Sequence, residues 1–320
     1  MGAVRRIPLR PRGLSGTRFR TGRGRRPRDQ GLRRRRRSGK DAGGIEKKMA
    51  EKFKKNGGVT AGICTSGSRV KLAVLAGGGF SSASKKSLNQ EKLLFPMLDR
   101  LLGRRSARLK DLSALCVITG PGRFTGLRVG LTLAGVLKTL AGIRVYSSTL
   151  FEVLAGQAAA SKEFGAWAAV RKCPRVAALT HAFKDEYFCQ LFDVSGQWPV
   201  VSDQRPGAAG SKSRATSHEP RSTDPKCTPV GPPRWLKDVE MAEYLKAAGR
   251  DLYVIADSEE KPEIYALVPS GCGKAPPRIS KILPEFVIKT GLALRNRDLS
   301  PLYLKPAKYE LGNHADTARA

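Results

Sequence analysis

The stretch Leu115-Cys-Val-Ile-Thr-Gly-Pro-Gly-Arg-Phe-Thr-Gly-Leu-Arg-Val-Gly130 combines a strand, a sharp turn and the start of a helix. Its first residues, Leu115–Ile118, are a short apolar run bounded by turn residues, which predicts a buried strand. Gly120–Gly122 predict the turn, because proline presets φ and glycine permits positive φ. From about Thr125, apolar residues recur every three or four positions, which predicts a helix.

The predicted helix carries small residues at every fourth position: Gly126, Gly130 and Ala134. Each glycine in a helix interior costs about 1 kcal/mol relative to alanine, so close approach of another backbone should offset this cost. Two arrangements would supply it: tight packing inside the same domain, or a docking face for another helix. Both stay open from the spacing alone. The docking interpretation would include the predicted helix Leu88–Leu102 as a second part of the same interface.

The charge of the chain is strongly basic. The formal net charge is +32 over 320 residues; residues 1–48 hold 18 Lys/Arg and three Asp/Glu, which is +15 and leaves +17 for residues 49–320. Both parts should attract polyanions such as tRNA. Residues 1–48 are rich in Arg, Gly and Pro and lack apolar periodicity, which predicts a disordered basic extension.

Three interpretations of this extension stay open. Met49 stands just before the first predicted strand, so the favoured one is a misplaced start with Met49 as the true first residue. The other two are an RNA-binding arm and an Arg-rich transit peptide.

Several classes of protein fit the composition poorly. Six cysteines without a C-x-x-C pair indicate reduced thiols, and three dispersed histidines do not suggest a metal site. No apolar run reaches the roughly 18 residues of a membrane span. We therefore expect a cytoplasmic protein with no membrane partner and no metal.

The predicted elements fall into two halves of an α/β chain. Residues 49–170 and 171–320 each begin with antiparallel hairpins and continue into αβ units, a weak internal duplication visible only as element order. The second half contains a Pro/Gly/Ser/Lys-rich segment, residues 204–234, which predicts a mobile loop, and ends in a frayed tail.

The glycine pattern invites a phosphate-binding interpretation, which the neighbouring residues oppose. A dinucleotide-binding fold needs an acidic residue at the end of the next strand to bind the ribose. Here that strand ends Val145-Tyr146-Ser147, without an acid. A P-loop fails because Leu127 stands where lysine is required. No G-x-S-x-G occurs, and two of the three histidines lie in segments predicted to be disordered, so a catalytic triad is not expected.

The segment Gly120–Gly130 resembles the G-P-G-S-F-T-G-[LV]-R-[IV]-G signature of the TsaB family, bacterial partner subunits of the machinery that makes threonylcarbamoyladenosine in tRNA. Other family motifs are matched in order over roughly residues 59–310: Gly62–Ser66, Gln90–Pro96, Ser148–Leu150, Ala178–Tyr187 and Pro301–Leu304. The resemblance implies a two-lobed actin-like, ribonuclease-H-like fold of the ASKHA superfamily, with mixed sheets flanked by helices.

Departures from the superfamily pattern are informative. Nucleotide-binding members place an Asp at the end of the first strand of each lobe, where this chain has Cys64 and Thr180. Neither supplies a hard anionic oxygen to Mg²⁺. Family positions are also altered at Gln90, Arg123 and Ala182, so a degenerate copy is an open alternative.

The resemblance implies a non-catalytic subunit that binds and supports a TsaD-type transferase together with a TsaE-type ATPase. It implies that ATP and threonylcarbamoyl-adenylate are used by the complex and not bound autonomously, that tRNA is contacted indirectly, and that the isolated chain forms a homodimer. The alternatives are a basic RNA-binding accessory protein and a nucleotide-binding enzyme. The predicted partner-binding residues are Gly120, Pro121, Gly122, Phe124, Thr125, Gly126, Arg128, Gly130 and Ala134.

Overall fold

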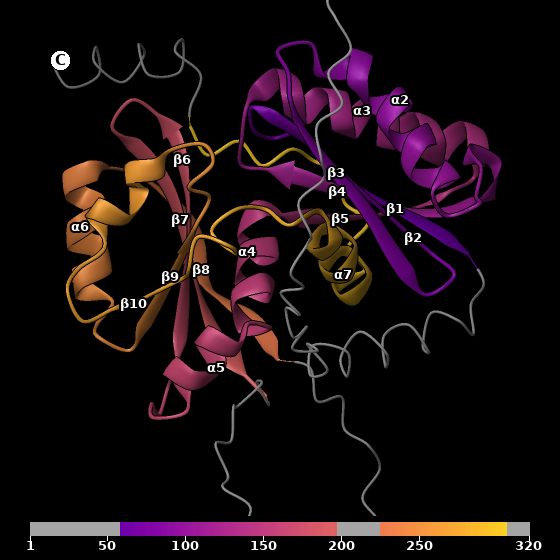
Figure 1. The fold of residues 1–320 in the computed structure, drawn as a ribbon. Coiled ribbons are helices and arrows are strands. Elements are labelled where there is room, and N and C mark those ends of the chain that lie inside the picture. Colours follow the sequence, from indigo (N-terminus) through magenta and orange to yellow (C-terminus); the bar gives the residue numbers. More distant parts are fainter. Residues whose placement is uncertain (1–57, 197–224, 306–320) are drawn as a thin grey trace, which may run out of the picture. The chain divides into compact units, whose positions relative to one another are not determined.

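A computed structural model describes residues 58–196 and 225–305 of the chain, which form two five-stranded mixed sheets with helices on their faces (Figure 1). Several predictions lie outside the described residues. These are the disordered extension 1–48, most of the predicted mobile loop, a predicted strand at Trp198–Val201 and the tail beyond residue 305.

The first sheet has the strand order β3-β2-β1-β4-β5. Strands β1, β2 and β3 pair antiparallel, whereas β1, β4 and β5 pair parallel. β1 is buried along its whole length, as expected of a central strand, and the polar β3 lies at an edge. The strands are β1 (Val59–Cys64), β2 (Arg69–Ala76), β3 (Gly79–Lys86), β4 (Leu112–Gly120) and β5 (Arg144–Thr149).

Helices cover both faces of the first sheet. Helices α2 (Gln90–Gly103) and α3 (Phe124–Ala141) pack on one face, and α7 (Pro284–Leu294) packs on the other (Figure 1). The alternation of β1 explains the two layers, since Ile63 belongs to the core with α2 and α3 while Gly62 faces α7. A Cβ on Gly62 would lie 2.7 Å from Ile288 Cγ1, so glycine permits the close approach of α7.

The second sheet has the order β10-β9-β6-β7-β8. Strands β6, β7 and β8 pair antiparallel, and β6, β9 and β10 pair parallel, so the two sheets share one strand order and direction. The internal duplication predicted from element order is confirmed. The strands are β6 (Arg175–Phe183), β7 (Glu186–Ser195), β8 (Lys226–Lys237), β9 (Leu252–Ala256) and β10 (Gly273–Lys274).

Strand β8 corrects the predicted loop 204–234, because residues from Lys226 onward pair with β7. The composition misled the prediction: Pro229, Pro232 and Pro233 are typical of loops. They are tolerated here because β8 is an edge strand, whose outer side needs no ladder hydrogen bonds.

Helices α4 (Leu150–Ala159) and α5 (Lys162–Ala168) follow the first sheet, and α6 (Asp238–Ala247) follows β8. Two short 3-10 turns, η1 (Leu109–Asp111) and η2 (Pro262–Leu267), complete the described elements. A capping box starts α4: Glu152 N donates to Thr149 Oγ1 at 3.2 Å, and Thr149 N donates to Glu152 Oε2 at 2.7 Å.

The sequence boundary at residue 170 separates the two sheets but not their helices. α4 precedes that boundary and packs on β6 and β8 of the second sheet, whereas α7 comes from the second half and packs on the first sheet. Each half of the chain thus supplies a helix to the other half's sheet, and α4 also contacts α7.

Helix α3 is long and apolar enough to cross a membrane by length and composition, the one such helix among the described residues. The helix contains Arg128 and Lys138, so it does not contradict the expectation that no uninterrupted apolar run reaches about 18 residues. The criterion is weak, because core helices of soluble proteins pass it too.

Candidate functional site

The predicted turn connects β4 to α3 and approaches two other segments closely. Gly120 has φ of +135°, a conformation that favours glycine. The backbone of Leu302 lies against it, with Leu302 N donating to Thr119 O at 2.8 Å. Gly122 lies against the carbonyl of Ser66 in the loop between β1 and β2, where a Cβ would collide. The glycines of the turn therefore serve packing inside the chain, and Pro121 is buried beside them.

The stripe of small residues on α3 also faces inward. A Cβ on Gly126 would collide with the carbonyl oxygen of Thr65, and one on Gly130 would lie 2.6 Å from Thr65 Oγ1. Ala134 is fully buried in the core of the first sheet. The prediction that Gly126, Gly130 and Ala134 form a docking face is therefore wrong: they let α3 settle onto the β1–β2 loop.

The opposite side of α3 carries the exposed members of the predicted site. Phe124, Thr125 and Arg128 line a groove of about 570 Å³ between α2 and α3. Phe95 of α2 and Phe124 of α3 are each 51% exposed, a high value for aromatic side chains. The full lining is Glu91, Leu94, Phe95, Phe124, Thr125, Arg128, Val129, Thr132, Leu133 and Val136.

The groove arises because each helix has apolar residues on more than one side. α2 buries Leu94, Leu98, Leu101 and Leu102 against the sheet, and Phe95 extends the apolar surface away from it. The sequence indicated α2 as part of an interface, but it did not identify the outer face of α3 from Val129 to Val136. The signal was present as apolar residues outside the small-residue stripe.

An aromatic and cationic cluster lies at the end of the groove. The Phe124 ring centroid is 5.4 Å from that of Tyr303, and the Arg128 guanidinium carbon lies 3.8 Å from the Phe124 centroid. This contact holds a cation over the ring face. Arg128 is exposed and Tyr303 is partly so, which makes the cluster accessible on the surface described.

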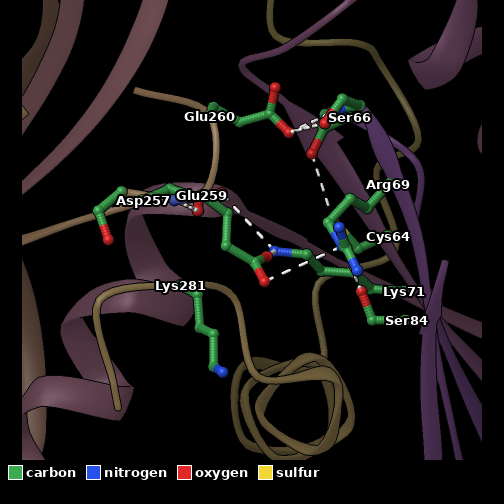
Figure 2. A network of polar contacts seen from close by, with 12 residues as sticks. Cys64, Ser66, Arg69, Lys71, Ser84, Asp257, Glu259, Glu260 and Lys281 are labelled. Atoms are coloured by element: carbon green, nitrogen blue, oxygen red, sulfur yellow. Dashed lines mark hydrogen bonds and ion pairs between the residues drawn. The ribbon is translucent and has the colours of Figure 1, made fainter. Parts of the chain in front are cut away.

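A second polar site lies where β1 ends (Figure 2). Lys71 of β2 pairs with Cys64 across the sheet, and its side chain is only 4% exposed. Its Nζ lies 2.6 Å from Glu259 Oε2 and 3.8 Å from Asp257 Oδ2, both on the segment that follows β9. This segment comes from the second sheet, so the ion pairs connect the two sheets.

The loop between β1 and β2 holds a third carboxylate from the same segment. Ser68 donates to Glu260 Oε1 from both its backbone N and its Oγ, each at 2.7 Å. The guanidinium of Arg123, at the start of α3, lies 3.6 Å from Glu260 Oε2. Figure 2 shows Glu259 and Glu260 turned towards the β1–β2 hairpin.

Burial sets the protonation of these groups. Burial raises the pKa of the Cys64 thiol, so Cys64 is neutral at pH 7. Burial alone would lower the pKa of Lys71, but the carboxylates of Asp257 and Glu259 contribute to raising it overall, so its ammonium stays charged. Asp257 is farther from that ammonium than Glu259, and burial raises its pKa to about 6 despite the attraction of Lys71.

These residues do not suit a metal-bound phosphate. The end of β1 presents a neutral thiol and a buried ammonium, and the nearby carboxylates are engaged with Lys71 and the loop. In β6, which continues to Phe183, the buried Oγ1 of Thr180 has no hydrogen-bond partner in the described structure. Within residues 58–196 and 225–305, no group of three His, Cys, Asp or Glu could hold a metal ion.

The sequence did not single out Lys71, Asp257, Glu259 or Glu260. Two signals pointed to them: a lone lysine in the apolar strand Val70–Leu75, and three acids directly after the buried strand Leu252–Ala256. Neither signal shows that the two segments meet, because they lie almost 200 residues apart. They meet only in the tertiary structure, where the segment after β9 of the second sheet contacts β2 of the first sheet.

The chain was compared with protein-family models, curated proteins and solved structures. The family model "TsaD: tRNA N6-adenosine threonylcarbamoyltransferase" matches residues 82–192, about a third of the chain. No curated protein matches the chain in sequence.

Two solved structures resemble the whole described fold. YeaZ from Pseudomonas aeruginosa is 19% identical with a TM-score of 0.51, and covers 77% of this chain and 100% of its own. A protein described as similar to peptidase YeaZ, also from Pseudomonas aeruginosa, is 19% identical with a TM-score of 0.52, covering 78% and 100%. The chain thus has the same fold as these structures, with two mixed sheets flanked by helices as expected from the sequence. These matches agree with the family resemblance seen in the sequence.

Proposed function

We propose that the chain is a non-catalytic partner subunit of the system that makes threonylcarbamoyladenosine in tRNA, and that it binds a TsaD-type transferase through the groove between α2 and α3. The match to the TsaD family model and the YeaZ-like fold support a role in that system. The observation that carries the binding role is the groove itself, with Phe95 and Phe124 half exposed on an apolar surface.

A protein partner is the occupant that this surface favours. Aromatic residues and arginine are enriched among residues that dominate binding energy, and the groove presents Phe95, Phe124 and Arg128 together. In the complex, a TsaE-type ATPase would join the transferase, and ATP and threonylcarbamoyl-adenylate would be bound there. In the absence of the transferase, a second copy of this chain would cover the same groove as a homodimer, in the cytoplasm.

Co-expression with TsaD-type and TsaE-type subunits, followed by size exclusion, tests the proposal. Phe95→Asp should raise the apparent Kd for the TsaD-type subunit by at least about tenfold and reduce co-elution, because it places a charge in the apolar contact. Val239→Asp is the matched control, since Val239 is an exposed apolar residue of a helix, α6, outside the groove. Equal binding of both variants, or no co-elution of the unchanged chain, would contradict the proposal.

A basic RNA-binding accessory protein is the second candidate, favoured by the charge and by exposed rings beside cations. Besides Phe124 with Arg128, the exposed Phe183 has Lys184 Nζ 5.5 Å and Lys305 Nζ 5.7 Å from its centroid. Rings and cations of this kind stack on unpaired bases. The affinity of residues 49–320 for tRNA, measured across a salt series, distinguishes this function from the partner role. An affinity within tenfold of that of the full chain, falling steeply as the salt concentration rises, would favour RNA binding.

A nucleotide-binding enzyme is the third candidate, and the residues at the end of β1 argue against it. Titration calorimetry measures directly whether the chain binds ATP or NAD. Micromolar binding by the isolated chain would replace the proposed partner role.

A further inference from the structure

The segment that follows α7 is fixed to the first sheet by backbone hydrogen bonds. Ser147 N, in β5, donates to Asn296 O at 2.9 Å. Leu302 N donates to Thr119 O, in β4, at 2.8 Å. A Cβ on Gly120 would lie 2.7 Å from the carbonyl oxygen of Leu302, so a larger residue there would push the segment away. The segment therefore lies against β4 and β5.

The end of this segment, Pro301–Lys305, is called the strap below. Its side chains alternate between core and surface, as in an extended chain. Leu302 and Leu304 are partly buried and pack against the large hydrophobic core that includes α4, whereas Tyr303 between them is 46% exposed. The Tyr303 ring lies beside that of Phe124, with 5.4 Å between the ring centroids. The strap thus supplies an aromatic ring to the end of the groove between α2 and α3.

A lysine at the end of the strap contacts the second sheet. Lys305 Nζ lies 2.5 Å from Glu186 Oε2, at the start of β7, and the Glu186 side chain is largely buried. The same ammonium lies 5.3 Å from the ring centroid of Trp235 in β8. An ion pair that is partly removed from water is stronger than a fully exposed one. The position of Tyr303 is therefore set from both sides, by Leu302 on the first sheet and by Lys305 on the second.

The end of the groove also holds a cation without an anionic partner. The exposed Arg128 has its guanidinium carbon 3.8 Å from the Phe124 centroid. Within the described ranges 58–196 and 225–305, no carboxylate pairs with Arg128. A free guanidinium beside two half-exposed rings suits a protein surface that brings apolar side chains and one carboxylate.

We propose that Tyr303 and Arg128 belong to the surface that receives the TsaD-type subunit, with Arg128 paired there with an acidic residue of that subunit. The Lys305–Glu186 ion pair positions Tyr303 for this contact. The inference rests on the proposed function and extends the docking surface beyond α2 and α3. Partner binding then depends on the second sheet, because loss of the ion pair on β7 frees the strap that carries Tyr303.

The Kd of the full chain for a TsaD-type subunit, measured by titration calorimetry, tests these roles. Tyr303→Ala and Arg128→Gln should each raise the Kd at least about fivefold, and Lys305→Ala should raise it about threefold. Lys305→Arg keeps the charge and should restore binding. Lys261→Ala is the matched control, since Lys261 is a lysine of similar exposure in an ion pair outside the strap, and it should leave the Kd unchanged.

A double variant separates positioning from a general loss of structure. If Lys305 acts through Tyr303, Lys305→Ala should change the Kd by less than about 1.5-fold in a Tyr303→Ala background. Hydrogen exchange of the free chain is a second readout. Lys305→Ala should speed exchange of the Leu302 amide, which donates to Thr119 O, and leave the amides of β1 unchanged.

The results distinguish this inference from the proposed function. Weaker binding by Phe95→Asp, with unchanged binding by Tyr303→Ala and Arg128→Gln, would overturn the inference and leave the groove as the docking site. Equal losses for Lys305→Ala with and without Tyr303→Ala would overturn the positioning role. Weaker binding by Tyr303→Ala but not by Phe95→Asp would support the strap and contradict the groove, whereas no binding by the unchanged chain would overturn both.

Discussion

The two sheets share one strand order, and they differ most where their central strands end. In the first sheet, Cys64 at the end of β1 pairs with Lys71; in the second, Thr180 of β6 pairs with Phe188. Both partners are buried, but one is a cation and the other an apolar ring. The buried cation requires compensating anions, and the segment after β9 supplies them. The two repeats therefore differ in charge at this position, and the difference is compensated by acids from the second sheet.

Removal of the cation should have the largest effect on stability. Lys71→Ala leaves Asp257 and Glu259 near an apolar strand without their partner, and breaking a buried pair typically costs about 3–5 kcal/mol. Urea unfolding of the two proteins measures the difference. Phe188→Ala in the second sheet should also destabilise, through lost packing, but its cost should not depend on salt or pH.

Neutralisation of all partners together separates charge from packing. Lys71→Met combined with Asp257→Asn and Glu259→Gln removes the charges and keeps the volume, so it should recover most of the loss of Lys71→Ala. A loss of less than about 1 kcal/mol for Lys71→Ala would mean that water, and not the acids, compensates the lysine.

The pH dependence of stability should also differ between the two strand ends. Burial raises the pKa of Asp257 to about 6, above the ordinary value near 3.9, so the folded state binds this proton more tightly than the unfolded state. The stability from this group is therefore fully present below about pH 4 and is lost as pH rises through 6. The unfolding free energy of the unchanged protein minus that of Asp257→Asn should fall by up to roughly 3 kcal/mol from pH 4 to pH 7.

The second sheet supplies the control for this titration. Thr180 does not titrate, so Thr180→Val should change stability by an amount that is constant between pH 4 and pH 7. A flat difference for Asp257→Asn as well would show that the carboxylate is solvated in the folded protein.

The sequence predicted the elements of the fold more reliably than their contacts. Apolar periodicity and turn residues located the centre of β4, predicted as Leu115–Ile118 and observed as Leu112–Gly120, and the start of α3, predicted at about Thr125 and observed at Phe124, because these signals are local. The edge strand β8 was missed, since its prolines are compatible with pairing on one side only. The exchange of α4 and α7 between sheets was not predictable, because it depends on tertiary contacts.

The candidate site shows the same division. The sequence identified the strand, turn and helix of Leu115–Gly130. The spacing of its glycines fitted both internal packing and docking, and docking was the interpretation favoured together with the family resemblance. The structure selects internal packing for Gly126 and Gly130, and it moves the candidate docking surface to the other side of α3. Periodicity identifies the small-residue face of the helix, but it does not identify what packs against that face, which is Thr65 in a loop more than 60 residues earlier.

The smallest of these effects concerns that helix face and again distinguishes the two sheets. After β4 the first sheet continues into the long α3, which rests on the β1–β2 loop, whereas after β9 the second sheet has only the short turn η2. Gly126→Ala should cost about 1–3 kcal/mol, because its Cβ would collide with the carbonyl of Thr65, and backbone cannot easily move aside. Gly135→Ala, on the same helix with nothing within 4 Å, should instead stabilise by up to about 1 kcal/mol. Thermal unfolding of the two variants measures the opposite signs. Two changes of equal sign would mean that α3 does not rest on the loop, and the small-residue stripe would again be available to a partner.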